Sequence, residues 1–445
     1  MSLKRSLYSV FLYLIFPLVL LRLLLRSRTN PDYRKRWSER LGFVKNPSNK
    51  PVIWLHAVSV GEVIAAKPLI EDLLQTYSDT SILVTTTTPT GSDRVRDMFA
   101  EQLKTQQLLH VYFPYDLLGA LARFIKSFKP RILIVVETEI WPNLYAKCHK
   151  ENVPVVMVNA RLSKKSTQSY LKIKGLVAET LSKVNVIAVR SNIDEERFLQ
   201  LGADPSCTQQ IGNIKYDISV DESQSVKAKK CLSSWNTKDC EKRLVYVAAS
   251  THKGEDIKIL FTYENLLKQF PNLLLVIVPR HPERFDEVYD DCVEQLPKQL
   301  NIIRHSEVTN YSKLEDSQFN VIVGDSMGEM QMWYATADVV FIGGSLVETG
   351  GHNPLEATLF GVPVVSGPHM FNFEDIAGEL SSAELLFICD DEFEVTKSLS
   401  QLLSNSGVEQ GSQLSVYKDR AEKFMQQHQG VTARLSSLIS KILKA

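Results

Sequence analysis

The sequence has no net charge and no cysteine framework. Its 51 Lys and Arg residues are balanced by 51 Asp and Glu residues, which argues against a general nucleic-acid binder. The six cysteines show no C-x-x-C motif, no metal-ligand spacing and no paired-bridge spacing, so we interpret them as reduced thiols in a cytosolic protein. The nine histidines show no metal-ligand pattern in the sequence either.

Two common nucleotide-binding signatures are also missing. The chain contains no G-x-x-x-x-G-K-[ST] motif, which excludes a P-loop. No G-x-G-x-x-G motif follows the first expected strand of either half, which disfavours a dehydrogenase. The composition itself is ordinary, because 445 residues that are 44% hydrophobic suffice for two or three globular domains with separate cores.

The N-terminus differs from the rest of the chain in charge and hydropathy. Residues 1–50 contain eleven basic and two acidic residues, a net charge of +9, so residues 51–445 sum to −9. Leu7–Leu21 is an uncharged, mostly apolar run of 15 residues, which reaches 19 at Leu25 if Arg22 snorkels to the headgroups. No small-residue cleavage site follows, which disfavours a signal peptide. We expect a retained membrane anchor, and its length leaves open whether it spans the bilayer or enters one leaflet.

Basic residues after the apolar run outnumber those before it. The positive-inside rule therefore predicts that the main body lies in the cytoplasm. The same residues would contact anionic lipids of the inner leaflet, the alternative being a charged face exposed to solvent. They are Arg22, Arg26, Arg28, Arg34, Lys35, Arg36 and Arg40, against Lys4 and Arg5 before the run.

Short apolar runs alternate with helical spacing through the rest of the chain. Continuous Val, Ile and Leu runs predict parallel strands that helices cover on both faces. The pattern predicts an α/β protein with two Rossmann-like, doubly wound domains at 31–216 and 243–445, the second with C-terminal helices. Residues 1–30 form the anchor and basic segment, and the polar residues 217–242 form a linker. The expected strands are Val52–His56, Ile82–Thr86, Val111–Phe113, Ile132–Val136, Val155–Asn159, Val186–Val189, Leu244–Ala248, Leu274–Val278, Ile302–Arg304, Val321–Val323, Val339–Ile342, Val362–Val365 and Leu385–Ile388.

Two such domains joined by one linker are expected to enclose a cleft, and ligands of open α/β sheets bind beyond the carboxyl ends of the strands. The first strand runs into a turn that contains Gly61 and places Glu62 at the start of a helix. The helix N-terminus favours the ionised carboxylate, which can act as general base on an acceptor hydroxyl. The alternative is an ordinary acidic residue of a first helical turn.

Two more groups of the first domain lie where chemistry is expected. Glu137 and Glu139 follow the fourth strand and would share one side if that strand continued, the alternative being helix capping before Trp141. Lys215 lies next to the linker and can reach a phosphate in the cleft, the alternative being an ordinary solvated lysine.

The second domain has polar or glycine-rich turns after three strands. Arg280 and His281, held between prolines, suit an anionic ligand. Residues 324–330 and 343–357 are glycine-containing turns into helices, whose free N–H groups can hold phosphate, and Glu356 can bind ribose hydroxyls. One such turn is weak evidence for a ligand site, but three turns at successive strand ends predict a nucleotide site.

Seven stretches, in this order, resemble one family: HAVSVGE, ETEIWPNL, VNARLS, GNIKYD, VPRHPERF, GDSMGEM and GGSLVETGGHNPLEA. The chain resembles the 3-deoxy-D-manno-octulosonic acid (Kdo) transferases of Gram-negative bacteria over about residues 31–380. The resemblance implies a GT-B fold with the acceptor in the N-terminal domain and the donor in the C-terminal one. It also implies inverting transfer of Kdo from CMP-Kdo to the lipid A precursor (lipid IVA) at the inner membrane, without a metal or other cofactor.

The resemblance also implies a role for each matching residue. Glu62 would be the base that activates the acceptor, with Ser59 and Gly61 on the acceptor side. Glu137 and Lys215 would stabilise the transition state. The donor's CMP would be held by Pro279, Arg280, His281, Met327, Gly328, Glu329, Gly351, Asn353, Pro354, Leu355 and Glu356. Glu348 is not expected to be essential.

Two other classes remain open at this point. One is another GT-B enzyme that uses a UDP-sugar, either a transferase or a non-hydrolysing epimerase, although an epimerase would not need an anchor. The other is a membrane-tethered nucleotide-binding or scaffolding module without catalysis. The residues do not indicate how many Kdo units are transferred or what the oligomeric state is.

Overall fold

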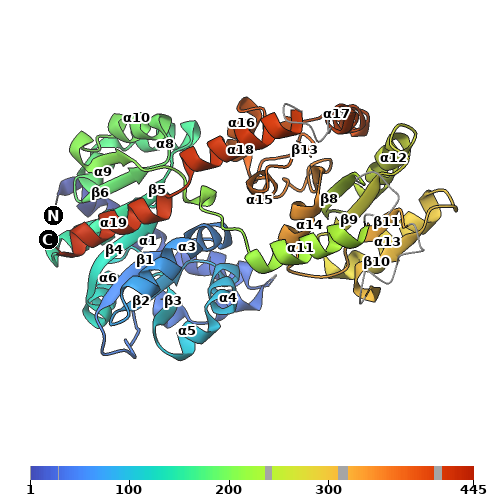
Figure 1. The fold of residues 1–445 in the computed structure, drawn as a ribbon. Helices are drawn as coiled ribbons and strands as arrows, with labels where there is room; N and C mark the ends of the chain where they lie inside the picture. Colours follow the sequence, from blue (N-terminus) through green and yellow to red (C-terminus); the bar gives the residue numbers. More distant parts are fainter. Residues whose placement is uncertain (1, 29, 236–242, 309–318, 405–412, 445) are drawn as a thin grey trace. The chain divides into compact units, whose positions relative to one another are not determined.

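The computed structural model describes residues 2–28, 30–235, 243–308, 319–404 and 413–444, and the chain forms two compact units. The first unit holds the described residues up to Asp217 and those from His428 on, and the second unit is Ile218–Gln427. Figure 1 shows the order of the elements in each unit.

The first unit is a seven-stranded parallel sheet with helices on both faces. Residues alternate between the faces of β1 (Val52–His56): Trp54 joins a core with α6, α7, α9 and α10, whereas Leu55 joins a core with α3, α4 and α19. The sheet order is β3-β2-β1-β4-β5-β6-β7. The other strands are β2 (Ser81–Thr86), β3 (Leu108–Tyr112), β4 (Pro130–Val136), β5 (Val155–Ala160), β6 (Val186–Val189) and β7 (Thr208–Gln210), and the helices are α3 (Val60–Thr76), α4 (Pro89–Met98), α5 (Ala100–Lys104), α6 (Leu118–Phe128), α7 (Pro142–Lys150), α8 (Lys164–Leu171), α9 (Lys174–Leu181), α10 (Asn192–Gln200) and α19 (Val431–Lys444).

The second unit is also a seven-stranded parallel sheet between helices, with the order β10-β11-β9-β8-β12-β13-β14. Helices α12, α13 and α17 pack on one core, and the Trp235 ring of α11 stacks on Trp333 of α14. The strands are β8 (Val245–Thr251), β9 (Leu274–Pro279), β10 (Ile302–Arg304), β11 (Val321–Val323), β12 (Val339–Ile342), β13 (Val364–Ser366) and β14 (Leu386–Ile388), and the helices are α11 (Glu222–Trp235), α12 (Asp256–Leu267), α13 (Phe285–Gln295), α14 (Met330–Thr336), α15 (Leu355–Leu359), α16 (Glu374–Ser382), α17 (Glu392–Ser404) and α18 (Gln413–His428).

Each sheet has one place where the strand order reverses direction. In the first unit it lies between β1 and β4, and in the second between β8 and β12. The connections that follow these two parallel strands lead to opposite sides of the sheet, which opens a crevice beyond the carboxyl ends of the strands. The residues that follow these four strands are therefore the first to examine for a site.

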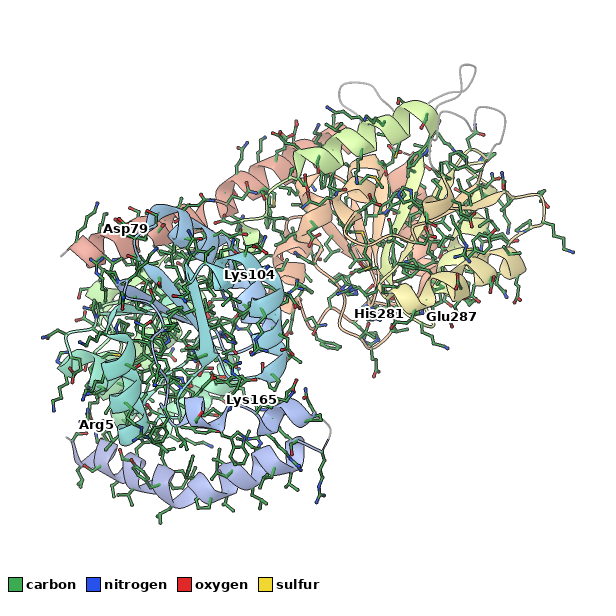
Figure 2. All side chains as sticks on the ribbon, turned by 90° about the horizontal axis from the view of Figure 1, so that it is seen from below. Arg5, Asp79, Lys104, Lys165, His281 and Glu287 are labelled. Carbon is green, nitrogen blue, oxygen red and sulfur yellow. The ribbon has the colours of Figure 1, made fainter. Side chains whose placement is uncertain are left out.

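The N-terminal helix α1 (Leu3–Arg26) lies along the first unit and contacts α7 and α9 (Figure 2). Tyr8 donates a hydrogen bond to Asp116 (3.0 Å) and Ser9 donates one to Asn143 (3.0 Å). Leu14, by contrast, is 73% exposed. Among the described residues, α1 is the one helix long and apolar enough to cross a membrane by length and composition. The short α2 (Trp37–Arg40) follows it.

The predicted doubly wound α/β class is confirmed, and so are the predicted strands, within a few residues at their ends. The edge strand β7 was not predicted, because Thr208–Gln210 has three polar residues and no apolar run.

Two predicted boundaries differ from the structure. The expected linker contains α11, which packs against α14 of the second unit. The C-terminal helix α19 was placed in the second domain but belongs to the first unit, because its apolar face (Val431, Leu435 and Ile439) is buried in the first unit's core beside α3. Residues 236–242 of the expected linker lie outside the described residues.

Candidate active site

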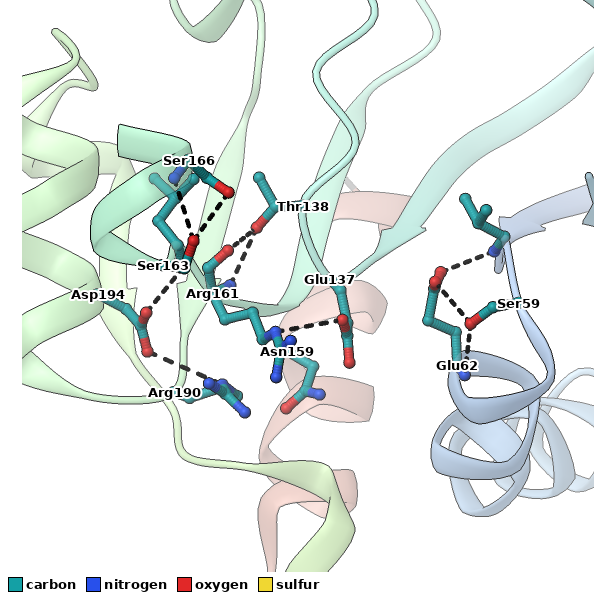
Figure 3. Close-up of polar contacts among 12 residues, drawn as sticks. Ser59, Glu62, Glu137, Thr138, Asn159, Arg161, Ser163, Ser166, Arg190 and Asp194 are labelled. Atoms are coloured by element: carbon teal, nitrogen blue, oxygen red, sulfur yellow. Dashed lines mark hydrogen bonds and ion pairs between the residues drawn. The ribbon is translucent and has the colours of Figure 1, made fainter. Parts of the chain in front are cut away.

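The turn after β1 fixes the Glu62 side chain. Ser59 caps α3, and the Glu62 N–H donates to Ser59 Oγ (3.4 Å). The Glu62 carboxylate in turn accepts bonds from the Val58 N–H (2.7 Å) and the Ser59 hydroxyl (3.0 Å), as Figure 3 shows. This arrangement resembles a capping box in which the Val58 N–H takes the place of the N-cap N–H, so the sequence pattern S-x-x-E explains the local fold. Gly61 is exposed, and an added Cβ there would meet only Ser59 Oγ, at 3.9 Å.

Burial raises the pKa of Glu62 to about 7. The bonds from Val58 and Ser59 oppose that rise, whereas the negative charges of Glu137 and Glu139 add to it. The sequence-based expectation considered only the helix N-terminus, which favours the ionised form. In the structure, burial and two neighbouring carboxylates outweigh that effect, so Glu62 exchanges a proton near neutral pH.

Glu137 follows β4 in a strained backbone conformation. Its φ is +60°, in the left-handed region that non-glycine residues rarely adopt, and Asn159 at the end of neighbouring β5 has φ +54°. Arg161 forms an ion pair with the Glu137 carboxylate (3.5 Å), and Figure 3 shows this pair facing the Glu62 turn. The strand ends at Val136, so the premise that Glu137 and Glu139 continue one strand is wrong.

Glu139 is a third carboxyl group of this turn, which the sequence paired with Glu137 without assigning it a role in the reaction. Burial raises its pKa to about 7; the nearby Trp141 indole opposes the rise, and Glu137 reinforces it. The capping alternative is not what the structure has, because the N-cap of α7 is Trp141 and makes no side-chain capping bond.

Lys215 lies in a 3-10 turn, Ile214–Tyr216, that is tied to the same sheet edge. Asn159 accepts a hydrogen bond from the Ile214 N–H (3.1 Å), and Asn213 accepts one from the Lys215 N–H (3.1 Å). The turn that carries Lys215 is therefore attached, through the Ile214 N–H, to Asn159 at the end of β5. The first unit thus brings Glu62, Glu137 and Glu139 together and holds Lys215 on the neighbouring turn.

Imidazole and guanidinium groups follow β8, β9 and β12 in the second unit. Pro279 ends β9, and the exposed Arg280 and His281 come directly after it (Figure 2). His281 lies edge-on to His252, which follows β8, at a ring-centroid distance of 5.4 Å. His252 and His352 were not predicted as a pair, because they are 100 residues apart, and His352 lies in the glycine-rich segment 343–357 without having been singled out there.

Glu255 holds the turns that carry these histidines. This fully buried carboxylate accepts four backbone N–H bonds, from His252, Gly344, Ser345 and Leu346, at 2.6–2.9 Å. Burial raises the pKa of Glu255, and the four donors oppose the rise. The turns after β8 and β12 are therefore fixed to each other through one side chain.

The predicted Met327-Gly328-Glu329 turn lies between β11 and α14. Met327 is exposed, and Gly328 has φ +81° with open space beside it. Burial would raise the pKa of Glu329, but bonds from Lys227 (2.7 Å), Ser326 (2.5 Å) and the nearby His305 lower it. The Glu329 carboxylate is thus already bound by side chains, one of them from α11.

The glycine-rich segment after β12 is packed against the protein at several positions. Gly351 has φ +70°, and an added Cβ would overlap the sulfur of Met370. Asn353 accepts a bond from the Leu355 N–H (3.2 Å) where α15 begins. Burial raises the pKa of Glu356, and a bond with Asn353 opposes the rise. Pro354 and Leu355 are buried.

Among the described residues, no group of three or more His, Cys, Asp or Glu side chains has the geometry to hold a metal ion.

The chain is similar to known proteins in sequence and in fold. Residues 35–218 match the model of a family described as 3-deoxy-D-manno-octulosonic-acid transferase (kdotransferase). The 3-deoxy-D-manno-octulosonic acid transferase of Haemophilus influenzae is 43% identical over 374 residues, which are 84% of this chain and 84% of that protein.

Two solved structures show the fold. A glycosyltransferase from Rickettsia africae is 13% identical, with a TM-score of 0.53, and is matched over 89% of this chain and all of its own. A UDP-GlcNAc 2-epimerase from Neisseria meningitidis is 15% identical, with a TM-score of 0.50, over 88% of this chain and 99% of its own. The expected class, GT-B with two Rossmann-like units and an apolar N-terminal helix, is confirmed.

Proposed function

The chain belongs to the Kdo transferase family and is a glycosyltransferase, and from this premise we propose that it moves Kdo from CMP-Kdo to the lipid A precursor lipid IVA. The transfer inverts the anomeric carbon and needs no metal ion. The observation that carries the proposal is the half-buried Glu62 carboxyl, which is fixed by bonds from Val58 and Ser59 and whose pKa is raised to about 7.

Glu62 acts as the general base. Its carboxylate takes the proton of the acceptor hydroxyl while that oxygen bonds to the anomeric carbon and the bond to CMP breaks. A base with a pKa near the working pH combines a useful ionised fraction with a strong pull on the proton. The bonds from Val58 and Ser59 hold the carboxylate in place, which lowers the entropy cost of alignment.

Glu137 and Lys215 stabilise the transition state on the same unit. Positive charge develops on the sugar as CMP leaves, and a carboxylate near Glu62 favours it. Arg161 forms an ion pair with the Glu137 carboxylate and so orients it. Lys215 offers a positive charge from a turn that Asn159 anchors, which suits the negative charge of a departing phosphate.

The second unit binds the donor through the turns after β9, β11 and β12. Arg280 and His281 are exposed at the end of β9 and suit a phosphate. Gly328 leaves open space beside the backbone, so a ligand can approach its N–H closely. Glu356 lies near the start of α15, next to Asn353, where a ribose hydroxyl can donate to it.

Helix α1 keeps the enzyme on the cytoplasmic side of the inner membrane, near its lipid acceptor. It contacts the first unit through hydrogen bonds of Tyr8 and Ser9 and through the Phe16 ring against Tyr115, whereas Leu7, Leu14 and Leu18 are more than 60% exposed. An apolar face of this kind suits the acyl region of one leaflet, with the following arginines at the headgroups.

The test is a transfer assay with detergent-solubilised full-length protein, CMP-Kdo, a tetraacylated lipid A precursor and EDTA. Wild type should form product, and mass spectrometry should show how many Kdo units are added. Glu62→Gln should be inactive while retaining the wild-type circular dichroism spectrum. Glu71→Gln is the matched control, because Glu71 lies on the same helix, its side chain is 46% exposed, and it forms a surface ion pair with Lys67 (3.2 Å).

Product from Glu62→Gln at the wild-type rate would contradict the base and leave the family intact. No product from folded wild type would contradict the donor and acceptor, and UDP-sugars would then be the donors to screen.

A further inference from the structure

Two histidines at the strand-order reversal of the second unit share one short hydrogen bond. His252 follows β8, and His352 lies in the glycine-rich segment after β12. Their Nε2 atoms are 2.9 Å apart and their rings are nearly parallel, with centroids 5.1 Å apart. A bond between two Nε2 atoms requires that one carries a hydrogen and the other a lone pair. The pair in this geometry therefore carries at most one positive charge.

The charges around the pair are mostly positive. Arg280 and His281, from the end of β9, act on both rings, and Arg284 acts on His252. The opposing charge on His252 is Asp256 of α12, but that carboxylate already accepts bonds from Arg284 (2.5 Å) and Thr251 (2.8 Å).

The other acidic groups nearby are occupied or distant from the pair. Glu255 is filled by four backbone N–H groups. Glu283 is 75% exposed and lies 3.9 Å from the His281 ring nitrogen. The pair thus lies in a cationic environment whose carboxylates are bound elsewhere, an arrangement that attracts an anion.

From this geometry we infer that His252 and His352 form a proton-sharing subsite for an anionic oxygen of the donor, and that the pair takes up one proton when the anion binds. The inference rests on the proposed function, because it takes the nucleotide to bind in this unit. The anionic oxygen belongs either to the phosphate or to the sugar carboxylate of the donor.

The protonation states support an uptake of one proton. Burial, together with the charges of His252, Arg280 and His281, lowers the pKa of His352 to about 4. Burial is also the first cause that lowers the pKa of His252. The pair is therefore neutral at pH 7. A bound anion raises the pKa of the pair, and each of the two Nδ1 atoms can then carry a hydrogen.

The test is calorimetric titration of the full-length protein with CMP at pH 7.5, in buffers of different ionisation enthalpy. The dependence of the heat on the buffer gives the number of protons taken up. Wild type should take up close to one proton per CMP, and its affinity should fall as pH rises, by up to tenfold for each pH unit. His352→Gln and His252→Gln should bind CMP more weakly, with no proton uptake and no pH dependence.

Three controls define the result. His149→Gln is the control variant, because His149 is an exposed imidazole of α7 in the first unit, and it should keep the proton uptake. Cytidine, which has no phosphate, and free Kdo, which has only the carboxylate, identify the anion. Uptake with CMP but not with Kdo assigns the phosphate, and uptake with Kdo alone assigns the carboxylate.

Proton uptake that is the same in His352→Gln and wild type would overturn the inference alone. A wild type that binds CMP, CMP-Kdo and Kdo without taking up a proton would do the same. No binding of CMP or CMP-Kdo to wild type would overturn the proposed donor as well.

Discussion

The two units have the same architecture and opposite chemistry at the same position. Each places its candidate residues beyond the two strands where the strand order reverses, β1 and β4 in the first unit, β8 and β12 in the second. The first unit has the acids Glu62 and Glu137 there, whereas the second has the imidazoles His252 and His352. Under the proposals above, the same position of the fold would serve proton abstraction in one unit and anion binding in the other.

Glu62→Gln tests the carboxylates of the first unit and should have the largest effect on the transfer rate. Loss of the base should lower kcat by about 10²–10⁴-fold, while the affinity for CMP stays within about twofold, because the donor residues lie in the other unit. Transfer kinetics and CMP titration on the same preparation measure both quantities. A parallel loss of CMP affinity would show that the two halves do not act separately.

The next largest difference is expected in stability, between an added Cβ at Gly343 after β12 and one at Gly61 after β1. An added Cβ at Gly343 would overlap the Ser250 carbonyl oxygen, so Gly343→Ala should destabilise the second unit by about 2–4 kcal/mol. Gly61→Ala should change stability by less than about 1 kcal/mol, because its Cβ has open space. Urea unfolding measures both variants, and equal losses of stability would contradict the difference between the turns.

Arg280→Ala tests the cationic groups of the second unit and should have a smaller effect, on the affinity for CMP. Loss of one exposed charge-assisted contact should weaken CMP binding by about tenfold, or about 1.4 kcal/mol. Arg304→Ala is the control, because Arg304 pairs with Asp286 and Glu307 instead. Unchanged affinity by calorimetry in Arg280→Ala would remove Arg280 from the donor site.

The smallest predicted effect is on the pH dependence of stability, through the titration of Glu139. Burial raises the pKa of Glu139 to about 7, above its unfolded value of 4.5, so the native state binds more protons than the unfolded state between these values. The stabilisation from Glu139 is complete below pH 4.5 and lost as pH rises to 7. Glu139→Gln should therefore raise Tm by about 2–4 °C at pH 8 and much less at pH 4.5. A Tm difference that is equal at both pH values would contradict this titration.

The sequence was sufficient for the strands and for the acidic turn, because both are local patterns. Val52–His56 is a continuous apolar run, and Ser59 with Glu62 forms a recognisable capping pattern. The histidine pair was not predictable in this way, since its members meet only when β8 and β12 become neighbours in the sheet. The place of α19 was also not predictable, because its apolar face fits either core by composition.

The pKa of Glu62 teaches the same lesson in electrostatic terms. The helix N-terminus is visible in the sequence and favours the anion. The burial and the charge of Glu137, which oppose it, depend on tertiary packing. A local sequence argument therefore identified the residue but not its protonation behaviour.

The most direct test of the account is the pH dependence of kcat/KM for the lipid acceptor at saturating CMP-Kdo. Glu62 must be ionised to accept the proton, so the rate of wild type should rise about tenfold per pH unit below pH 7 and level off above it. The residual rate of Glu62→Gln should not show this rise. A wild-type rate that is constant from pH 5.5 to 8, or a rise that persists in Glu62→Gln, would contradict Glu62 as the base.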